Sequence, residues 1–179
     1  MIYVALLRGI NVGGNNKVSM PQLKDAFERA GLKTVKTYIN SGNIIFRNDS
    51  HTPSELVDLL EKTIADEFGF TVNVLIRDID AMKAIVDAIP DSWRNDTTMK
   101  CDIMFLWNDI DREDILNELV IKPGIDSVRY VRGAVLFAVD RQNVTKSGLL
   151  RLIGTPLYKQ MTLRNCNTTR KLFELMSTI

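Results

Sequence analysis

The order of secondary-structure signals in the first 78 residues is the feature that most constrains the fold. Apolar runs with β-branched residues predict strands, and apolar residues at helical spacing predict helices between them. In chain order the predicted elements are a strand at 2–8, a helix ending at Gly31, strands at 34–40 and 43–47, a helix ending at Gly69 and a strand at 71–77. This β-α-β-β-α-β order is the ferredoxin-like signature.

Two capping boxes mark where the predicted helices begin. Ser19 is followed three residues later by Gln22, and Thr52 is followed three residues later by Glu55. In such a box the first side chain accepts from a backbone N–H of the first turn, and the second side chain bonds back to the capping residue. The sequence therefore predicts helices that start directly after Ser19 and Thr52.

The predicted topology brings two distant segments together. A ferredoxin-like sheet has the strand order 4-1-3-2 with antiparallel neighbours, so the first and third strands lie side by side. The end of the first strand and the tip of the hairpin between the second and third strands then share one edge of the sheet. We therefore expect residues 8–17 to lie beside residues 38–43.

The second half of the chain repeats this order more weakly. A polar stretch at 91–100 predicts a boundary between two small α+β lobes, 1–90 and 91–179, with related topology. The predicted elements are a helix near 78–89, a strand at 101–107, a helix near 111–120, a hairpin of 127–132 and 134–139 turning at Gly133, a helix near 146–153, a strand near 160–163 and a helix at 168–178.

Composition is that of a globular protein. The 179 residues are 45% hydrophobic and 25% charged, with a net charge of +1. Two cysteines and one histidine give neither metal-ligand spacing nor a disulfide framework, which favours a cytoplasmic location. The sequence predicts no membrane span, no metal and no cofactor.

Charge is unevenly distributed along the chain. Residues 141–171 carry seven Lys or Arg and no acid, whereas residues 51–120 carry six basic and sixteen acidic residues. The basic segment raises the alternative of a nucleic-acid-binding module. The sequence pI of about 7.7 is below the basic balance of most such domains.

The loop that follows the first strand has the composition of an anion site. Residues 8–17 read Arg-Gly-Ile-Asn-Val-Gly-Gly-Asn-Asn-Lys, with cations at both ends. Glycine and asparagine tolerate positive φ, and a glycine-rich backbone can direct several N–H groups at one anion. Arg8 adds a planar fork suited to carboxylate or phosphate. The spacing matches neither a P-loop nor a dinucleotide-binding fingerprint.

A third polar segment, 162–171, adds cations beside the start of the last predicted helix, which we expect Asn167 or Thr168 to cap. Cys101 is expected to be a buried thiol. Cys166 lies beside Arg164 and a helix start, and both favour a thiolate. The candidate ligand-binding residues are Arg8, Asn11, Gly13, Gly14, Lys17, Tyr38, Ser41, Asn43, Arg164, Asn165, Asn167 and Thr168.

Three motifs together resemble the bacterial domain-of-unknown-function 1697 (DUF1697) family. They are Tyr3-Val4-Ala5-Leu6-Leu7-Arg8-Gly9-Ile10-Asn11-Val12-Gly13-Gly14, Thr37-Tyr38-Ile39-Asn40-Ser41-Gly42-Asn43 and Thr162-Leu163-Arg164-Asn165-Cys166-Asn167-Thr168. The resemblance implies a small cytoplasmic α+β protein without an established activity, cofactor or catalytic set. One departure is Cys166, which stands where the family usually has Trp.

The residues leave three functions open. The first is a protein that binds a small anionic ligand, such as a nucleotide or a phosphorylated metabolite, at the loop and the hairpin. The second is a nucleic-acid-binding module that uses residues 141–171. The third is a structural or protein-interaction role, for which Arg8 and Arg164 should be buried and bonded to protein groups. Whether a reaction is catalysed and how many subunits assemble stay open.

Overall fold

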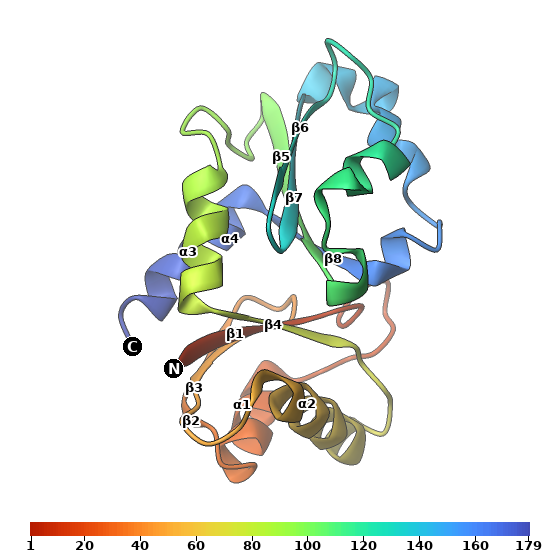
Figure 1. The fold of residues 1–179 in the computed structure, drawn as a ribbon. Coiled ribbons are helices and arrows are strands. Elements are labelled where there is room, and N and C mark those ends of the chain that lie inside the picture. Colours follow the sequence, from red (N-terminus) through yellow and green to blue (C-terminus); the bar gives the residue numbers. More distant parts are fainter. The chain divides into compact units, whose positions relative to one another are not determined.

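The fold is described from a computed structural model that covers residues 1–179 (Figure 1). Packing groups the chain into two units. The first contains Met1–Ile79 with Leu172–Ile179, and the second contains Asp80–Lys171. The polar stretch 91–100, where the sequence places its boundary, lies inside the second unit.

The first unit is built on a four-stranded antiparallel sheet with the strand order β2-β3-β1-β4. Read from the other edge this is 4-1-3-2, the order expected from the sequence. Its elements are β1 (Ile2–Leu7), α1 (Met20–Arg29), β2 (Lys33–Tyr38), β3 (Asn43–Arg47), α2 (Pro53–Phe68) and β4 (Val74–Asp78).

Helices α1 and α2 cover one face of this sheet (Figure 1). Alternate residues of β1 point toward them, and Ala5 and Leu7 are at most 1% exposed. Phe27 of α1 and Leu60 of α2 pack into the same cluster and are fully buried. The period-two pattern of the strand and the 3.6-residue pattern of the helices thus meet in one core.

The two predicted capping boxes differ in the structure. Around Thr52 both halves form, because its side chain accepts from the backbone N–H of Glu55 and the Glu55 carboxylate accepts from the backbone N–H of Thr52 at 2.7 Å. At Ser19 only the first half forms, at 3.4 Å. The Gln22 amide instead donates to Glu67 at 3.0 Å.

The second unit contains another four-stranded antiparallel sheet, in the order β6-β7-β5-β8. By position in the chain this repeats the order of the first sheet. The longer elements are α3 (Ile79–Ala88), β5 (Met99–Leu106), β6 (Ser127–Val131), β7 (Ala134–Asp140), β8 (Met161–Asn165) and α4 (Cys166–Met176); α3 begins and α4 ends in the first unit.

The helices predicted near 111–120 and 146–153 are not α-helices. These stretches form short 3₁₀ helices, η1 (Asn108–Ile110), η2 (Glu113–Glu118), η3 (Arg141–Lys146) and η4 (Gly148–Arg151), and η5 (Tyr158–Gln160) follows. In the first stretch the extended backbone of Arg112 separates η1 from η2, although the buried Ile115 and Leu119 keep a helical spacing. In the second, the extended backbone of Ser147 interrupts the helix.

Gly148 shows why that second stretch keeps close to its neighbour. A Cβ at this position would lie 2.0 Å from the carbonyl oxygen of Val120, so only glycine fits. Its N–H donates to Asp126 Oδ2 at 2.9 Å. The backbone of η4 is therefore held against the segment that leads into β6.

Gly42 has the same role in the first unit, at the start of the third strand. Its φ is +75°, and a Cβ there would lie 2.8 Å from Leu7 Cβ and 2.9 Å from Ile10 Cδ1. The Gly42 carbonyl accepts from the Leu7 N–H at 2.8 Å. The hairpin therefore packs directly against the end of β1.

We predict that Gly42→Ala destabilises the protein by about 2–4 kcal/mol, because it adds a left-handed backbone cost to an overpacked contact. Gly69→Ala is the matched control. Its φ is +77°, but nothing lies within 4 Å of the added Cβ, so the cost is about 1 kcal/mol. Urea unfolding of both variants measures the difference, and equal losses would contradict the contact.

Candidate functional site

The loop after β1 has the left-handed backbone that its composition predicts. Gly9, Asn11, Gly13, Gly14 and Asn16 all have positive φ, between 48° and 80°. Asparagine is the residue that most readily takes this conformation after glycine. The loop is therefore a sharply folded excursion between β1 and α1.

Internal hydrogen bonds close the loop on itself. The Asn11 N–H donates to Asn16 O and the Asn15 N–H donates to Val12 O, each at 3.2 Å. The Asn16 amide donates to Gly9 O at 3.2 Å. The N–H groups of Gly13 and Gly14, at the exposed tip, take no part in this network.

The side chain of Asn11 fixes the loop to two neighbours. Its Oδ1 accepts from the Val18 N–H at 2.8 Å, and its Nδ2 donates to Val18 O at 3.1 Å. The same Nδ2 lies 3.0 Å from Asn40 O in the hairpin. The predicted proximity of loop and hairpin is confirmed, and Asn11 supplies the link.

The hairpin uses its polar residues to shape its own turn. Asn43 is fully buried and donates to Tyr38 O at 3.1 Å and to Ser41 Oγ at 3.0 Å. Ile39 has a φ of +47° and is 51% exposed. A β-branched residue in the left-handed region is strained, and such strain is concentrated at functional sites.

A hollow of about 500 Å³ lies where the loop meets the start of α1. Three candidate residues line it, namely Asn11, Gly14 and Lys17. Arg8, Gly13, Tyr38, Ser41 and Asn43 are not part of its lining. The remaining lining residues are Val18, Ser19, Gln22, Asn40 and Phe68.

Sequence reasoning missed those last residues as parts of a site. Ser19 and Gln22 were visible only as a helix start, and their position after Lys17 is the signal that links them to the loop. Phe68 comes from the end of α2, and no local pattern connects it with the loop.

Two charged groups near the hollow matter most, the Lys17 ammonium and the Glu67 carboxylate, whose charge Arg29 neutralises. Lys17 is exposed and forms no ion pair. Glu67 accepts from Gln22 at 3.0 Å and from Arg29 at 2.7 Å. Both hydrogen bonds lower the pKa of Glu67, and the bond from Gln22 has the larger effect. The positive charge of Arg29 also offsets the charge of the carboxylate. The start of α1 adds the positive end of a helix dipole.

The candidate residues of the third polar segment, Arg164, Asn165, Asn167 and Thr168, belong to the second unit. Arg164 on β8 is 8% exposed, and its Nη1 donates to Thr162 Oγ1 at 3.0 Å and to Leu163 O at 2.7 Å. Burial lowers the pKa of Arg164 to about 10. The guanidinium thus bonds to neighbouring protein groups.

The cap of α4 differs from the prediction. Asn165, and neither Asn167 nor Thr168, is the capping side chain, because its Oδ1 accepts from the Thr168 N–H at 2.8 Å. The helix therefore begins at Cys166, two residues earlier than expected. Asn167 instead donates to Asn95 O at 2.8 Å.

Both cysteines are fully buried. A hydrogen bond with Cys101 and the charge of Arg170 lower the pKa of Cys166 to about 7, and the same hydrogen bond raises the pKa of Cys101. Arg170 also donates to Trp93 O at 2.8 Å and to Pro90 O at 3.1 Å. Cys166 is therefore a buried thiol whose surroundings favour the thiolate, as the sequence predicts.

The comparisons with known proteins agree with this architecture. The sequence model described as "Protein of unknown function (DUF1697)" matches residues 1–137. The chain belongs to the DUF1697 family. The loop and the hairpin lie inside the matched region, and the segment 162–168 lies beyond it. No curated protein matches the chain.

A solved structure extends the likeness over the whole chain. It is described as the structure of conserved bacterial protein SP0830 from Streptococcus pneumoniae. That protein is 27% identical, the match covers 98% of each chain, and the TM-score is 0.83. The DUF1697 chain has no helix long and apolar enough to span a membrane. It also has no cluster of three or more His, Cys, Asp or Glu side chains suited to a metal ion.

We predict that Asn11→Gly, which keeps the positive φ, lowers stability by about 1–2 kcal/mol because the bonds to Val18 and Asn40 are lost. Amide exchange at Val18 should accelerate most. Asn16→Gly removes a single side-chain bond and is the control. Unchanged protection of Val18 in Asn11→Gly would show that the side chain does not hold the loop.

Proposed function

We propose that the hollow beside the loop binds a small anion, of the class of nucleotides or phosphorylated metabolites. The observation that carries the proposal is the position of Lys17. Its exposed, unpaired ammonium lines the hollow. Ser19 and Gln22, at the start of α1, line it as well. The positive end of the helix dipole and a nearby cation together favour a phosphate group.

The tip of the loop adds further donors. The N–H groups of Gly13 and Gly14 are exposed and make no hydrogen bond within the protein. Gly14 itself lines the hollow. The Asn11 amide, in contrast, donates to Val18 O and Asn40 O. The Asn43 amide donates to Tyr38 O and Ser41 Oγ. In this proposal the asparagines shape the site, and the Lys17 ammonium and the backbone N–H groups of the loop tip bind the anion.

At least three of the seven basic side chains in the segment 141–171 bond to groups of the protein. Arg164 is buried, Arg170 donates to two carbonyls, and Arg141 donates to Asp96 O at 2.9 Å. These contacts weigh against a continuous nucleic-acid-binding surface. No specific contact favours a nucleic-acid surface there.

The finer description of the fold is also a proposal. We infer that the first unit is a ferredoxin-like fold and that the second is a variant of it with 3₁₀ helices in the crossovers. The two strand orders support this description. The lobe limits 1–90 and 91–179 and the cytoplasmic location stay predictions.

We predict that ADP, glucose 6-phosphate or inorganic phosphate shifts the amide resonances of Gly13, Gly14 and Ser19 in a two-dimensional NMR titration. Lys17→Gln should weaken binding of the responding anion about tenfold or more, because a charge-assisted hydrogen bond contributes ~1.5–3 kcal/mol.

The control for this titration is Lys24→Gln. Lys24 lies on α1, forms an ion pair with Glu28 at 3.6 Å and does not line the hollow. This variant should bind the anion like the original chain. Equal affinity of all three proteins, or no resonance shift with any of the anions, would overturn the proposal.

A further inference from the structure

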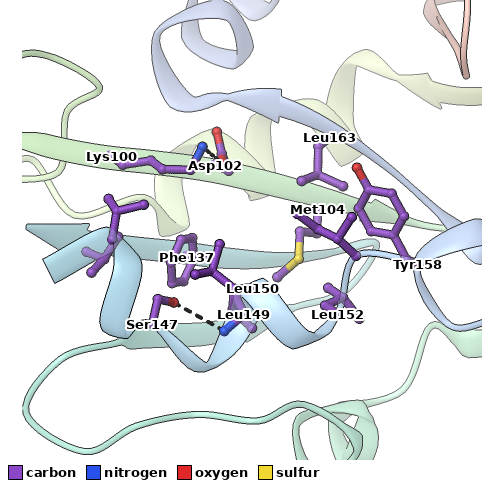
Figure 2. Close-up of a pocket in the computed structure, with 13 residues that line it drawn as sticks. Lys100, Asp102, Met104, Phe137, Ser147, Leu149, Leu150, Leu152, Tyr158 and Leu163 are labelled. Carbon is purple, nitrogen blue, oxygen red and sulfur yellow. Dashed lines mark hydrogen bonds and ion pairs between the residues drawn. The ribbon is translucent and has the colours of Figure 1, made fainter. Parts of the chain in front are cut away.

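The second unit contains a partly open cavity of about 180 Å³ that is separate from the hollow beside the loop (Figure 2). Its floor is one face of the second sheet. Asp102 and Met104 of β5, Phe137 of β7 and Leu163 of β8 lie on this face as cross-strand neighbours. Leu149 of η4 and Leu152, the residue directly after η4, close the opposite side.

The cavity follows from the way this sheet is covered. In the first unit, two α-helices of ten and sixteen residues pack on the sheet face. In the second unit, 3₁₀ helices of three to six residues take that place. Short 3₁₀ segments present fewer side chains to a sheet than a continuous α-helix, so they leave space above Phe137 and Met104.

The chemistry of the lining is divided between apolar walls and one ion pair. Met104, Phe137, Leu149 and Leu163 give an apolar interior, in which water has few partners. At one end, Lys100 and Asp102 face each other with Nζ 3.0 Å from Oδ2 (Figure 2). A pocket with apolar walls and a few convergent polar groups is typical of small-molecule sites.

The mouth of the cavity combines exposed apolar side chains with an ion pair. Leu150 and Ile153 both line it and are 47% and 63% exposed. The Lys100 side chain is 37% exposed and that of Asp102 is 15% exposed. A ligand entering here would cover apolar side chains and meet both charges of the pair.

The ion pair restricts the charge of that ligand. A singly charged group would draw one member of the pair away and leave the other, partly buried charge without its partner, which is costly. A zwitterion avoids this, because its carboxylate can bind Lys100 while its ammonium binds Asp102. The apolar part then has to fit the interior, and a cavity of ~150 Å³ accepts a benzene ring.

We propose that this cavity binds a free α-amino acid with an apolar side chain of the size of leucine, methionine or phenylalanine. The side chain occupies the space between Phe137, Met104 and Leu149. The amino and carboxylate groups sit at the mouth on the Lys100–Asp102 pair. The site is separate from the hollow lined by Lys17 and does not depend on its function.

The test is calorimetric titration of the full chain with L-leucine, L-methionine and L-phenylalanine. At least one should bind, and three analogues of phenylalanine should bind at least tenfold more weakly, namely 3-phenylpropionate, phenethylamine and L-alanine. The first two each lack one charge and the third lacks the ring. Analogue affinities equal to that of the amino acid, or no binding of any amino acid, would overturn the proposal.

Variants assign the binding to this cavity. Lys100→Gln and Asp102→Asn should each weaken amino-acid binding at least tenfold, and the more exposed Lys100 keeps the test valid if Asp102→Asn does not fold. Lys83→Gln is the control, because Lys83 pairs with Asp87 on α3 and does not line the cavity. Unchanged affinity in Lys100→Gln would place any binding elsewhere.

Discussion

The close packing of the hairpin against the end of β1 is the constraint on which the first unit depends. Only a residue without a Cβ allows Gly42 to approach Leu7 and Ile10, and the Leu7 N–H bonds to its carbonyl. This contact fixes where the hairpin tip lies. Asn11 can then reach Asn40 while it holds Val18, so that the loop, the hairpin and the start of α1 form one rigid corner.

The two units show how one strand order can leave cavities in two different places. Both sheets place the first strand of the unit between the third and the fourth. In the first unit, long amphipathic helices fill the covered face, and the hollow lies outside the core at the sheet edge. In the second, short 3₁₀ helices leave a cavity on the covered face itself. The difference follows from helix length, since the strands correspond.

The elements with strong local signals were predictable from the sequence. The box at Thr52 and Glu55 and the stop at Gly69 combine local residues with local hydrogen bonds, and the hairpin turns at Gly133, between two short apolar strands. The 3₁₀ stretches were not, because their apolar residues serve a sheet face whose shape is set by distant strands. The cap of α4 was missed for a similar reason, since three neighbouring polar residues, Asn165, Asn167 and Thr168, compete for one role.

The proximity of the loop and the hairpin was predictable, but the contacts of the individual side chains were not. Topology located the corner, yet composition treats every asparagine alike, whether it binds a ligand or the backbone. Asn11 and Asn43 have amide groups directed at carbonyls of their own unit, so they build the corner. Lys17 differs because no acid lies within ion-pair distance of its ammonium. Within this DUF1697 chain, ligand recognition at the loop would therefore depend on one exposed cation and on the backbone, and the asparagine side chains hold that backbone in place through their hydrogen bonds.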